Sequence, residues 1–145
     1  MPLILDRSAG HLATSGDGPL AIDFSGITPD RLVGRSAAEI ARLRILADER
    51  PCAVGDVCQV RGTADDGRIE CLGDFTRVHW LAADMQWGEM VVAGSAGRHA
   101  GEGMTGGRLS IGGDAGDWLA AELAGGTVHV AGHAGDNTAG ALPGS

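Results

Sequence analysis

The sequence predicts a mainly β fold: a parallel β-helix of about four coils, preceded by a small α/β N-terminal cap. The first observation is a 19-residue unit that repeats without gaps over residues 88–106, 107–125 and 126–144. The second is the start of each unit, where apolar residues alternate with others before two glycines three residues apart. A fixed period of this length is typical of a solenoid, alternation is typical of a half-buried strand, and glycine reaches the positive φ of sharp turns.

The first 68 residues contain no repeat and are predicted to form the cap. Short apolar runs at Leu3–Leu5 and Leu20–Phe24 predict two strands, with Gly16–Pro19 as the turn between them. Thr28 followed by Pro29 indicates the start of a helix, because proline suits the first helical position.

A second helix is predicted at about Ser36–Arg44. Ser36 and Glu39 have the spacing of a capping box, and Ile40 begins an apolar helical face. Gly55–Arg61 predicts a further strand that leads toward the coils. We expect the cap to cover the N-terminal end of the solenoid, where strand backbone would otherwise remain unpaired.

Residues 69–87 are predicted to form a degenerate first coil, which is found by shifting the repeat back by 19 residues. The run Trp80–Ala83 reappears two periods later as Trp118–Ala121, which supports this register. The glycine pair is absent from the first coil. A less regular coil is typical of a terminal repeat.

In the three regular coils, equivalent residues are expected to stack into ladders about 4.8 Å apart. Three ladders are predicted to face the interior: Met90, Leu109 and Val128; Met104, Leu123 and Leu142; and Ala96, Ala115 and Ala134. Two polar ladders are predicted to face outward: Ser95, Asp114 and His133; and Arg98, Asp117 and Asp136. Asp117 and Asp136 would repel slightly, so that face is expected to be solvated.

Charge and hydropathy limit the partners and the location. The formal net charge is -8 and the sequence pI is about 4.9, which disfavours nucleic acid and anionic membranes as partners. The sequence has no run of about 18 apolar residues and no evident secretory signal, so a cytoplasmic location is expected. Cys52, Cys58 and Cys71 form no CxxC pair and are interpreted as reduced thiols.

No catalytic, cofactor-binding or metal-binding residues are predicted on this chain. His129 and His133 are four apart, but they are expected on a strand and beyond the next turn, and His79 and His99 occupy different repeat positions. These histidines are interpreted as surface or edge residues, and metal binding by them remains a hypothesis. Ser95, Ser110 and Ser145 lack a nucleophile-elbow context, and the Gly94–Gly97 turn recurs in every regular coil, so turn geometry explains it better than phosphate binding.

Several segments resemble one family. These segments are Ser25–Gly34 with its ITPD run, Ala38–Leu43, Val54–Val57 (VGDV, like a VGDLF-type strand), Gly73–Val78 (GDFTRV) and Gly113–Glu122 (GDAGDWLAAE). Together they resemble the C subunit of formylmethanofuran dehydrogenase and its bacterial counterpart, the C subunit of the formyltransferase/hydrolase complex. The resemblance runs from about residue 20 to the C-terminus.

The resemblance implies a right-handed β-helix subunit in a multisubunit one-carbon complex. Such complexes transfer, hydrolyse or form the formyl group on methanofuran-type carriers. The resemblance places the chemistry on other subunits (formyltransferase, amidohydrolase-like and B-subunit-like chains), which carry molybdenum or tungsten pterin, iron–sulfur clusters or zinc. Family members usually have more coils, so the chain is interpreted either as a truncated member or as one whose open end is covered by a partner. Ala120 and Ala139 replace frequent glycines.

Two other functions stay open from the sequence. Similar glycine repeats form the C-terminal domain of the glutamate synthase large subunit, so the chain is alternatively a β-helix spacer in nitrogen metabolism. A β-helix enzyme acting on polysaccharide would need a surface row of acidic or aromatic residues on consecutive coils. Trp118 has His99 and Asn137 beside it in its ladder, which supports that reading only weakly.

Overall fold

The computed structural model describes residues 2–8, 14–15, 18–19 and 21–136, and it is mainly sheet with short helices. In chain order the elements are β1 Leu3–Arg7, β2 Thr14–Ser15, β3 Gly18–Pro19, β4 Ile22–Asp23, α1 Pro29–Leu32, α2 Ala37–Ala41, β5 Arg44–Ala47, β6 Arg50–Ala53, α3 Val54–Val57, β7 Gln59–Arg61, β8 Arg68–Gly73, β9 Val78–His79, β10 Glu89–Val92, β11 Arg108–Ile111 and β12 Thr127–Val130. None of the described helices has the length and apolar character that crossing a membrane requires.

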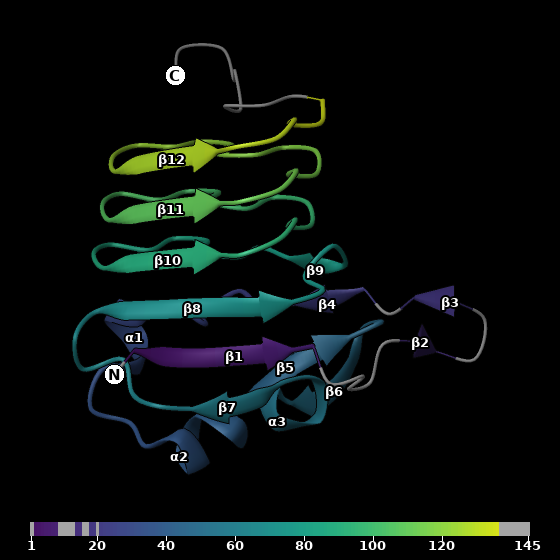
Figure 1. The fold of residues 1–145 in the computed structure, drawn as a ribbon, viewed down its shortest axis with the longest axis vertical. Helices are drawn as coiled ribbons and strands as arrows, with labels where there is room; N and C mark the ends of the chain where they lie inside the picture. Colours follow the sequence, from purple (N-terminus) through teal and green to yellow (C-terminus); the bar gives the residue numbers. More distant parts are fainter. Residues whose placement is uncertain (1, 9–13, 16–17, 20, 137–145) are drawn as a thin grey trace.

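The largest sheet has the order β12-β11-β10-β8-β1-β7, and its upper strands lie one above another like rungs (Figure 1). The pairs from β12 to β1 are parallel, and only β1 and β7 are antiparallel. Met90 pairs with Leu109 and Leu109 with Val128, which confirms the predicted 19-residue register. Met90 and Leu109 are fully buried, so this ladder forms the inner face of the sheet.

The two predicted polar ladders have a function that the sequence did not suggest. The side chain on one coil accepts a hydrogen bond from the backbone N–H of the equivalent residue on the next coil. Ser95 Oγ accepts from Asp114 N (2.9 Å), Asp114 Oδ1 from His133 N (2.8 Å), and Asp117 Oδ1 from Asp136 N (2.8 Å). Polar side chains therefore join successive coils in addition to the sheet hydrogen bonds.

The hydrogen bonds of these ladders explain why each coil has a glycine pair. The expectation that these glycines supply positive φ is wrong. No φ in the left-handed region occurs at Gly97, Gly132 or Gly135. Instead, a Cβ on Gly132 would lie 2.2 Å from Asp114 Oδ1, and a Cβ on Gly135 would lie 2.2 Å from Asp117 Oδ1. Glycine is needed because the accepting side chain approaches the backbone too closely for any other residue.

The N-terminal segment is continuous with the coils. β1 lies between β8 and β7 in the large sheet, and β4 pairs with β9 in parallel within the sheet β6-β5-β4-β9. Phe24 and Phe75 are fully buried and meet edge to face, with ring centroids 6.1 Å apart. One hydrophobic core therefore extends from the N-terminal elements into the stacked coils.

The capping box is confirmed, although the helix is shorter than expected. Ser36 Oγ accepts from Glu39 N (3.1 Å), and the Glu39 carboxylate accepts from Ser36 N (3.2 Å). α2 ends at Ala41, and β5 begins at Arg44.

The strand expected at Gly55–Arg61 is wrong in its first half, which forms the helical turn α3. Val54 and Val57 are both fully buried, and their i, i+3 spacing puts them on one helical face. Asp56 Oδ2 also accepts from Ala53 N (2.9 Å), which satisfies an amide at the start of this turn.

The first coil has a different register from the one the ungapped shift predicts. Ile69 pairs with Met90, 21 residues away, and Glu89 N donates to the carbonyl of Gly67 (2.8 Å) just as Arg108 N donates to that of Gly88 (2.9 Å). At the next corner the separation returns to 19, because Arg98 N donates to His79 Nδ1. The first coil thus contains two additional residues between its strand and its corner.

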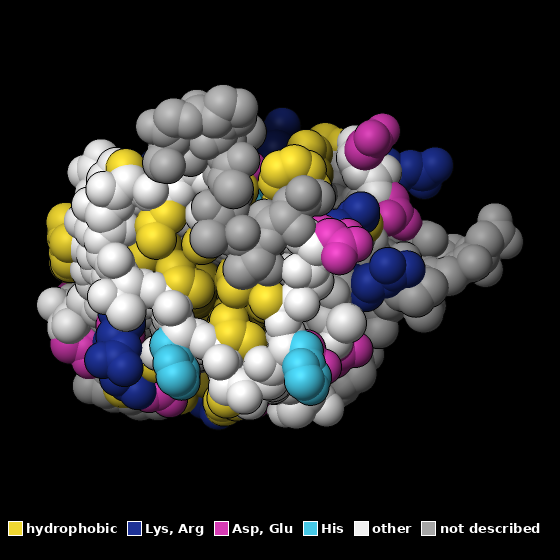
Figure 2. All heavy atoms as spheres, turned by 90° about the horizontal axis from the view of Figure 1, so that it is seen from above, with side chains coloured by type: hydrophobic (Ala, Val, Ile, Leu, Met, Phe, Trp, Pro, Cys, Tyr) yellow, Lys and Arg dark blue, Asp and Glu magenta, His cyan; other side chains and the backbone are white. Residues whose placement is uncertain are grey.

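The interior is less complete toward the C-terminal end of the described stack. Ala96 and Ala115 are buried as predicted, whereas Ala134 is exposed and Leu123 is 37% exposed, although both were expected inside. Figure 2, which looks down on this end, shows apolar side chains at the centre of the molecule. Predictions for Leu20, Asn137, Ala139, Leu142 and Ser145 lie outside the described residues, as does the Gly16–Asp17 part of the first turn.

Candidate functional site

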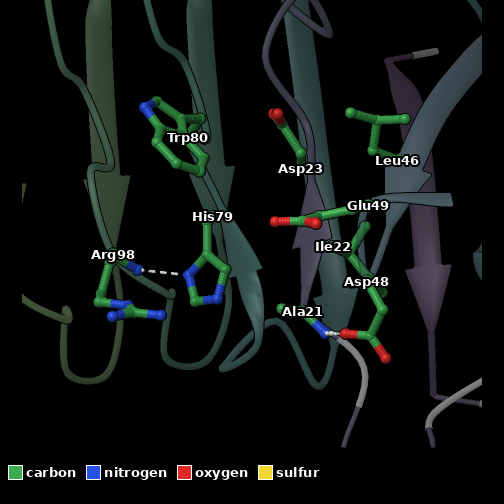
Figure 3. A pocket seen from close by; sticks show the side chains of 9 residues that line it. All are labelled: Ala21, Ile22, Asp23, Leu46, Asp48, Glu49, His79, Trp80 and Arg98. Carbon is green, nitrogen blue, oxygen red and sulfur yellow. Dashed lines mark hydrogen bonds between the residues drawn. The ribbon is translucent and has the colours of Figure 1, made fainter. Parts of the chain in front are cut away.

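A cleft of about 510 Å³ opens where β4 and the β5–β6 turn face the first two coils. It is lined by Ala21, Ile22, Asp23, Leu46, Asp48, Glu49, His79, Trp80 and Arg98 (Figure 3). The parallel pairing of β4 with β9 places Asp23 beside His79, although 56 positions separate them in the sequence. The cleft therefore exists only because the N-terminal elements pair with the first coil.

One wall of the cleft is a strained hairpin turn. Ala47 pairs with Arg50, so Asp48 and Glu49 form a two-residue connection, and both have positive φ (50° and 66°). This backbone suits Asn-Gly and is unfavourable for residues with a Cβ. Asp48 holds the turn in place, since its N–H donates to Ala21 O (2.8 Å) and its Oδ1 accepts from Ala21 N (2.9 Å). Strain of this kind is commonly found where a turn presents functional side chains.

The opposite wall is an aromatic stack. Trp80, His99 and Trp118 are equivalent residues on three coils, and their rings are parallel, with centroids 4.6 Å and 6.1 Å apart. Glu102 fixes two of them, because it accepts from Trp80 Nε1 (2.9 Å) and its Oε1 lies 3.1 Å from His99 Nδ1. The Trp80 ring that lines the cleft is therefore held rigidly.

His79 forms the base of the cleft and is only 6% exposed, so its interpretation as a surface or edge residue is wrong. Its Nδ1 accepts a hydrogen bond from Arg98 N (2.8 Å), so the ring proton lies on Nε2. Burial, together with the charges of Arg98, Arg77 and His99, lowers the pKa of His79 below its ordinary value, while Asp23 acts in the opposite direction. The ring is thus neutral at pH 7, and no described residue accepts the Nε2 proton.

The other residues that the sequence singled out do not gather at a site. His129 and His133 are exposed, Ser95 serves as a ladder acceptor, and Ser110 lies on β11. Within the described ranges, no group of three or more His, Cys, Asp or Glu residues is placed to hold a metal ion.

Sequence reasoning missed the cleft. The one signal available for it was the 19-residue spacing of the aromatic stack.

Two comparisons with known proteins find similar chains. No protein-family model matches the chain. The C subunit of a molybdenum-containing formylmethanofuran dehydrogenase 1 of Methanosarcina barkeri is 36% identical over 84 residues, which cover 55% of this chain and 28% of that protein. A chain in the crystal structure of the formyltransferase/hydrolase complex (FhcABCD) from Methylorubrum extorquens with methylofuran matches with a TM-score of 0.63 and 31% identity. The chain is thus similar to the formylmethanofuran dehydrogenase C subunit over part of that protein's length.

The matched proteins are longer than this chain. It spans 28% of the length of the curated relative, and its match to the solved complex covers 92% of this chain and 57% of the other.

The segments that carry the resemblance have structural roles in this chain. In the ITPD run, Asp30 Oδ2 accepts from Gln86 N (3.3 Å), which ties α1 to the first coil. The GDFTRV run leads from β8 into β9 and so ends directly before His79. The GDAGDW run supplies the ladder acceptors Asp114 and Asp117 and the outer ring of the aromatic stack.

Proposed function

We propose that this chain is a structural and assembly subunit of a one-carbon complex that transfers, hydrolyses or forms the formyl group on methanofuran-type carriers. The observation that carries this proposal is the match to a chain of the formyltransferase/hydrolase complex over 92% of this chain, at 31% identity. The match to the C subunit of a dehydrogenase supports the same assignment from sequence.

The architecture behind this function is a right-handed parallel β-helix over residues 69–145, with residues 1–68 as its cap. Its support is the parallel 19-residue register of β10, β11 and β12 and the hydrogen bonds between successive corners, such as Trp80 N to Arg98 O (2.9 Å). A stack of this kind offers long, flat faces on which other subunits can be positioned.

In this proposal the catalytic residues and cofactors belong to partner subunits. The proposed partners are formyltransferase, amidohydrolase-like and B-subunit-like chains. The molybdenum in the name of the curated relative suggests which group a dehydrogenase-type complex would carry on its other subunits. Cys52, Cys58 and Cys71 are free thiols, which supports a cytoplasmic location.

Purification of the tagged chain from its native cells tests the proposal. We expect a formyltransferase and an amidohydrolase-like chain to co-elute with it in fixed proportion. A metal-pterin subunit in the same fraction would identify the dehydrogenase type. Co-elution with glutamate synthase subunits would contradict the proposal in favour of a spacer in nitrogen metabolism, and recovery of the chain alone would contradict both.

A further inference from the structure

The charges around the cleft favour a cation. Three carboxylates line the cleft, those of Asp23, Asp48 and Glu49, against one guanidinium, that of Arg98. His79 adds no positive charge because its ring is neutral. Figure 3 shows the Glu49 carboxylate directed across the cleft toward His79. An excess of carboxylates in a concave site attracts cations and raises their local concentration.

The aromatic wall selects the kind of cation. Trp80 is held by its bond to Glu102 Oε2 (2.9 Å) and by stacking on His99 with an interplanar angle of 6°. A fixed indole beside carboxylates binds alkylammonium and guanidinium groups through its negative ring face. A hydrated metal ion would gain much less from this wall.

The base of the cleft requires a hydrogen-bond acceptor as well. His79 Nε2 carries the ring proton and has no acceptor among the described residues, and a buried donor without a partner is unfavourable. Nε2 is covered in the unbound protein, so an acceptor reaches it by displacing a side chain. Arg98 is exposed and lies beside the ring, which makes it the neighbour that can move (Figure 3).

We propose that the cleft binds one arginine or lysine residue of a partner protein. Its cationic end group lies between Trp80 and the carboxylates of Asp23 and Glu49, and a backbone carbonyl of the same segment accepts the proton of His79 Nε2. The volume of about 510 Å³ accommodates one long side chain with its flanking peptide groups. This inference rests on the proposed assembly function, which supplies the partner.

A titration of the isotope-labelled chain with N-acetylarginine methylamide tests the site by NMR. The expected result is a saturable shift of the Trp80 indole signal and of the Glu49 amide. N-acetylcitrulline methylamide, which has the same shape without the charge, should cause no saturable shift. Equal shifts with both compounds, or none with either, would overturn the proposal.

Three variants locate the binding. Glu49→Gln should weaken binding about threefold, the scale of one partly exposed ion pair. His79→Asn should weaken it about fivefold, because asparagine Oδ1 can still accept from Arg98 N while the Nε2 donor is lost. Glu122→Gln is the matched control, since this exposed carboxylate lies outside the cleft, and it should leave the affinity unchanged. Unchanged affinity in Glu49→Gln would refute the site.

The native complex then tests the partner. Excess N-acetylarginine methylamide and the Glu49→Gln substitution should each reduce retention of a partner subunit on the tagged chain. A complex that forms and ignores both changes would refute the partner assignment and leave a free basic amino acid or peptide as the ligand. Failure of any complex to form, with the probe still binding, would refute the assembly function and not the cleft.

Discussion

The corners of the first three coils contain left-handed backbone at alternate positions, and this makes a stabilising substitution predictable. In the third coil these positions are Trp118, Ala120 and Glu122, with φ of 63°, 56° and 54°. The equivalent of Glu122 in the second coil is Gly103, with φ of 71°. A Cβ in this region costs about 1–2 kcal/mol. Glu122 is exposed, so its replacement sacrifices no packing.

Glu122→Gly should therefore increase the free energy of unfolding. Removing the backbone strain stabilises the folded chain by about 1–2 kcal/mol. The additional freedom of glycine in the unfolded chain offsets about 0.5–1 kcal/mol of this. The expected net gain is roughly 0.5–1 kcal/mol, which corresponds to an increase in melting temperature of about 1–4 °C for a chain of this size. Equilibrium unfolding in urea, followed by tryptophan fluorescence, measures the gain as a shift in midpoint at constant slope.

Glu122→Ala is the control, because it removes the same carboxylate and keeps the Cβ at the same φ. It should differ from the natural protein by less than about 0.5 kcal/mol. The reasoning about strain is refuted if the glycine variant is no more stable than the alanine variant. A gain shared by both would mean that the carboxylate, and not the backbone, destabilises the corner.

Three further predictions concern the ladders and the buried groups. Asp114→Ala should destabilise by about 0.5–1.5 kcal/mol in urea unfolding because the amide of the next coil loses its acceptor, whereas Asp114→Asn should retain most of the stability. The free energy of unfolding should fall as the pH drops below about 6.5, because the unfolded chain takes up a proton at His79 before the folded chain does. Comparing urea unfolding midpoints at pH 7.5 and 5 measures this fall. The part of the fall that is due to His79 should be absent in the His79→Asn variant. Burial raises the pKa of Cys58 to about 12 and also raises that of Cys71, so iodoacetamide at pH 8 should modify the partly exposed Cys52 first, and mass spectrometry that finds all three equally modified in the folded protein would contradict this.

The features that sequence could predict are local or periodic. The Ser36–Glu39 capping box depends on four adjacent residues, and the Met90 ladder depends on a spacing that each coil repeats. The cleft depends on neither, because it requires Asp23 to pair with His79 across more than 50 residues. The turn at Asp48–Glu49 could not be predicted from the sequence either, since it lacks the Asn-Gly pair that usually marks a turn of this backbone type.

The glycine pairs show how a correct pattern can carry a wrong reason. Their recurrence predicts turns, and the freedom of glycine to reach positive φ is the ordinary reason for glycine in a turn. In the structure the glycine precedes the amide that donates to the coil below, and a Cβ on Gly97 would lie 2.4 Å from His79 Nδ1. The glycine pattern therefore reflects close contact between successive coils. The accepting side chain can differ from coil to coil, provided that a glycine leaves room for it. The acceptor is a histidine nitrogen at His79 and an aspartate oxygen at Asp117, and both residues occupy the same repeat position. The cleft arises where this structural position is occupied by an acceptor that also carries an unused donor.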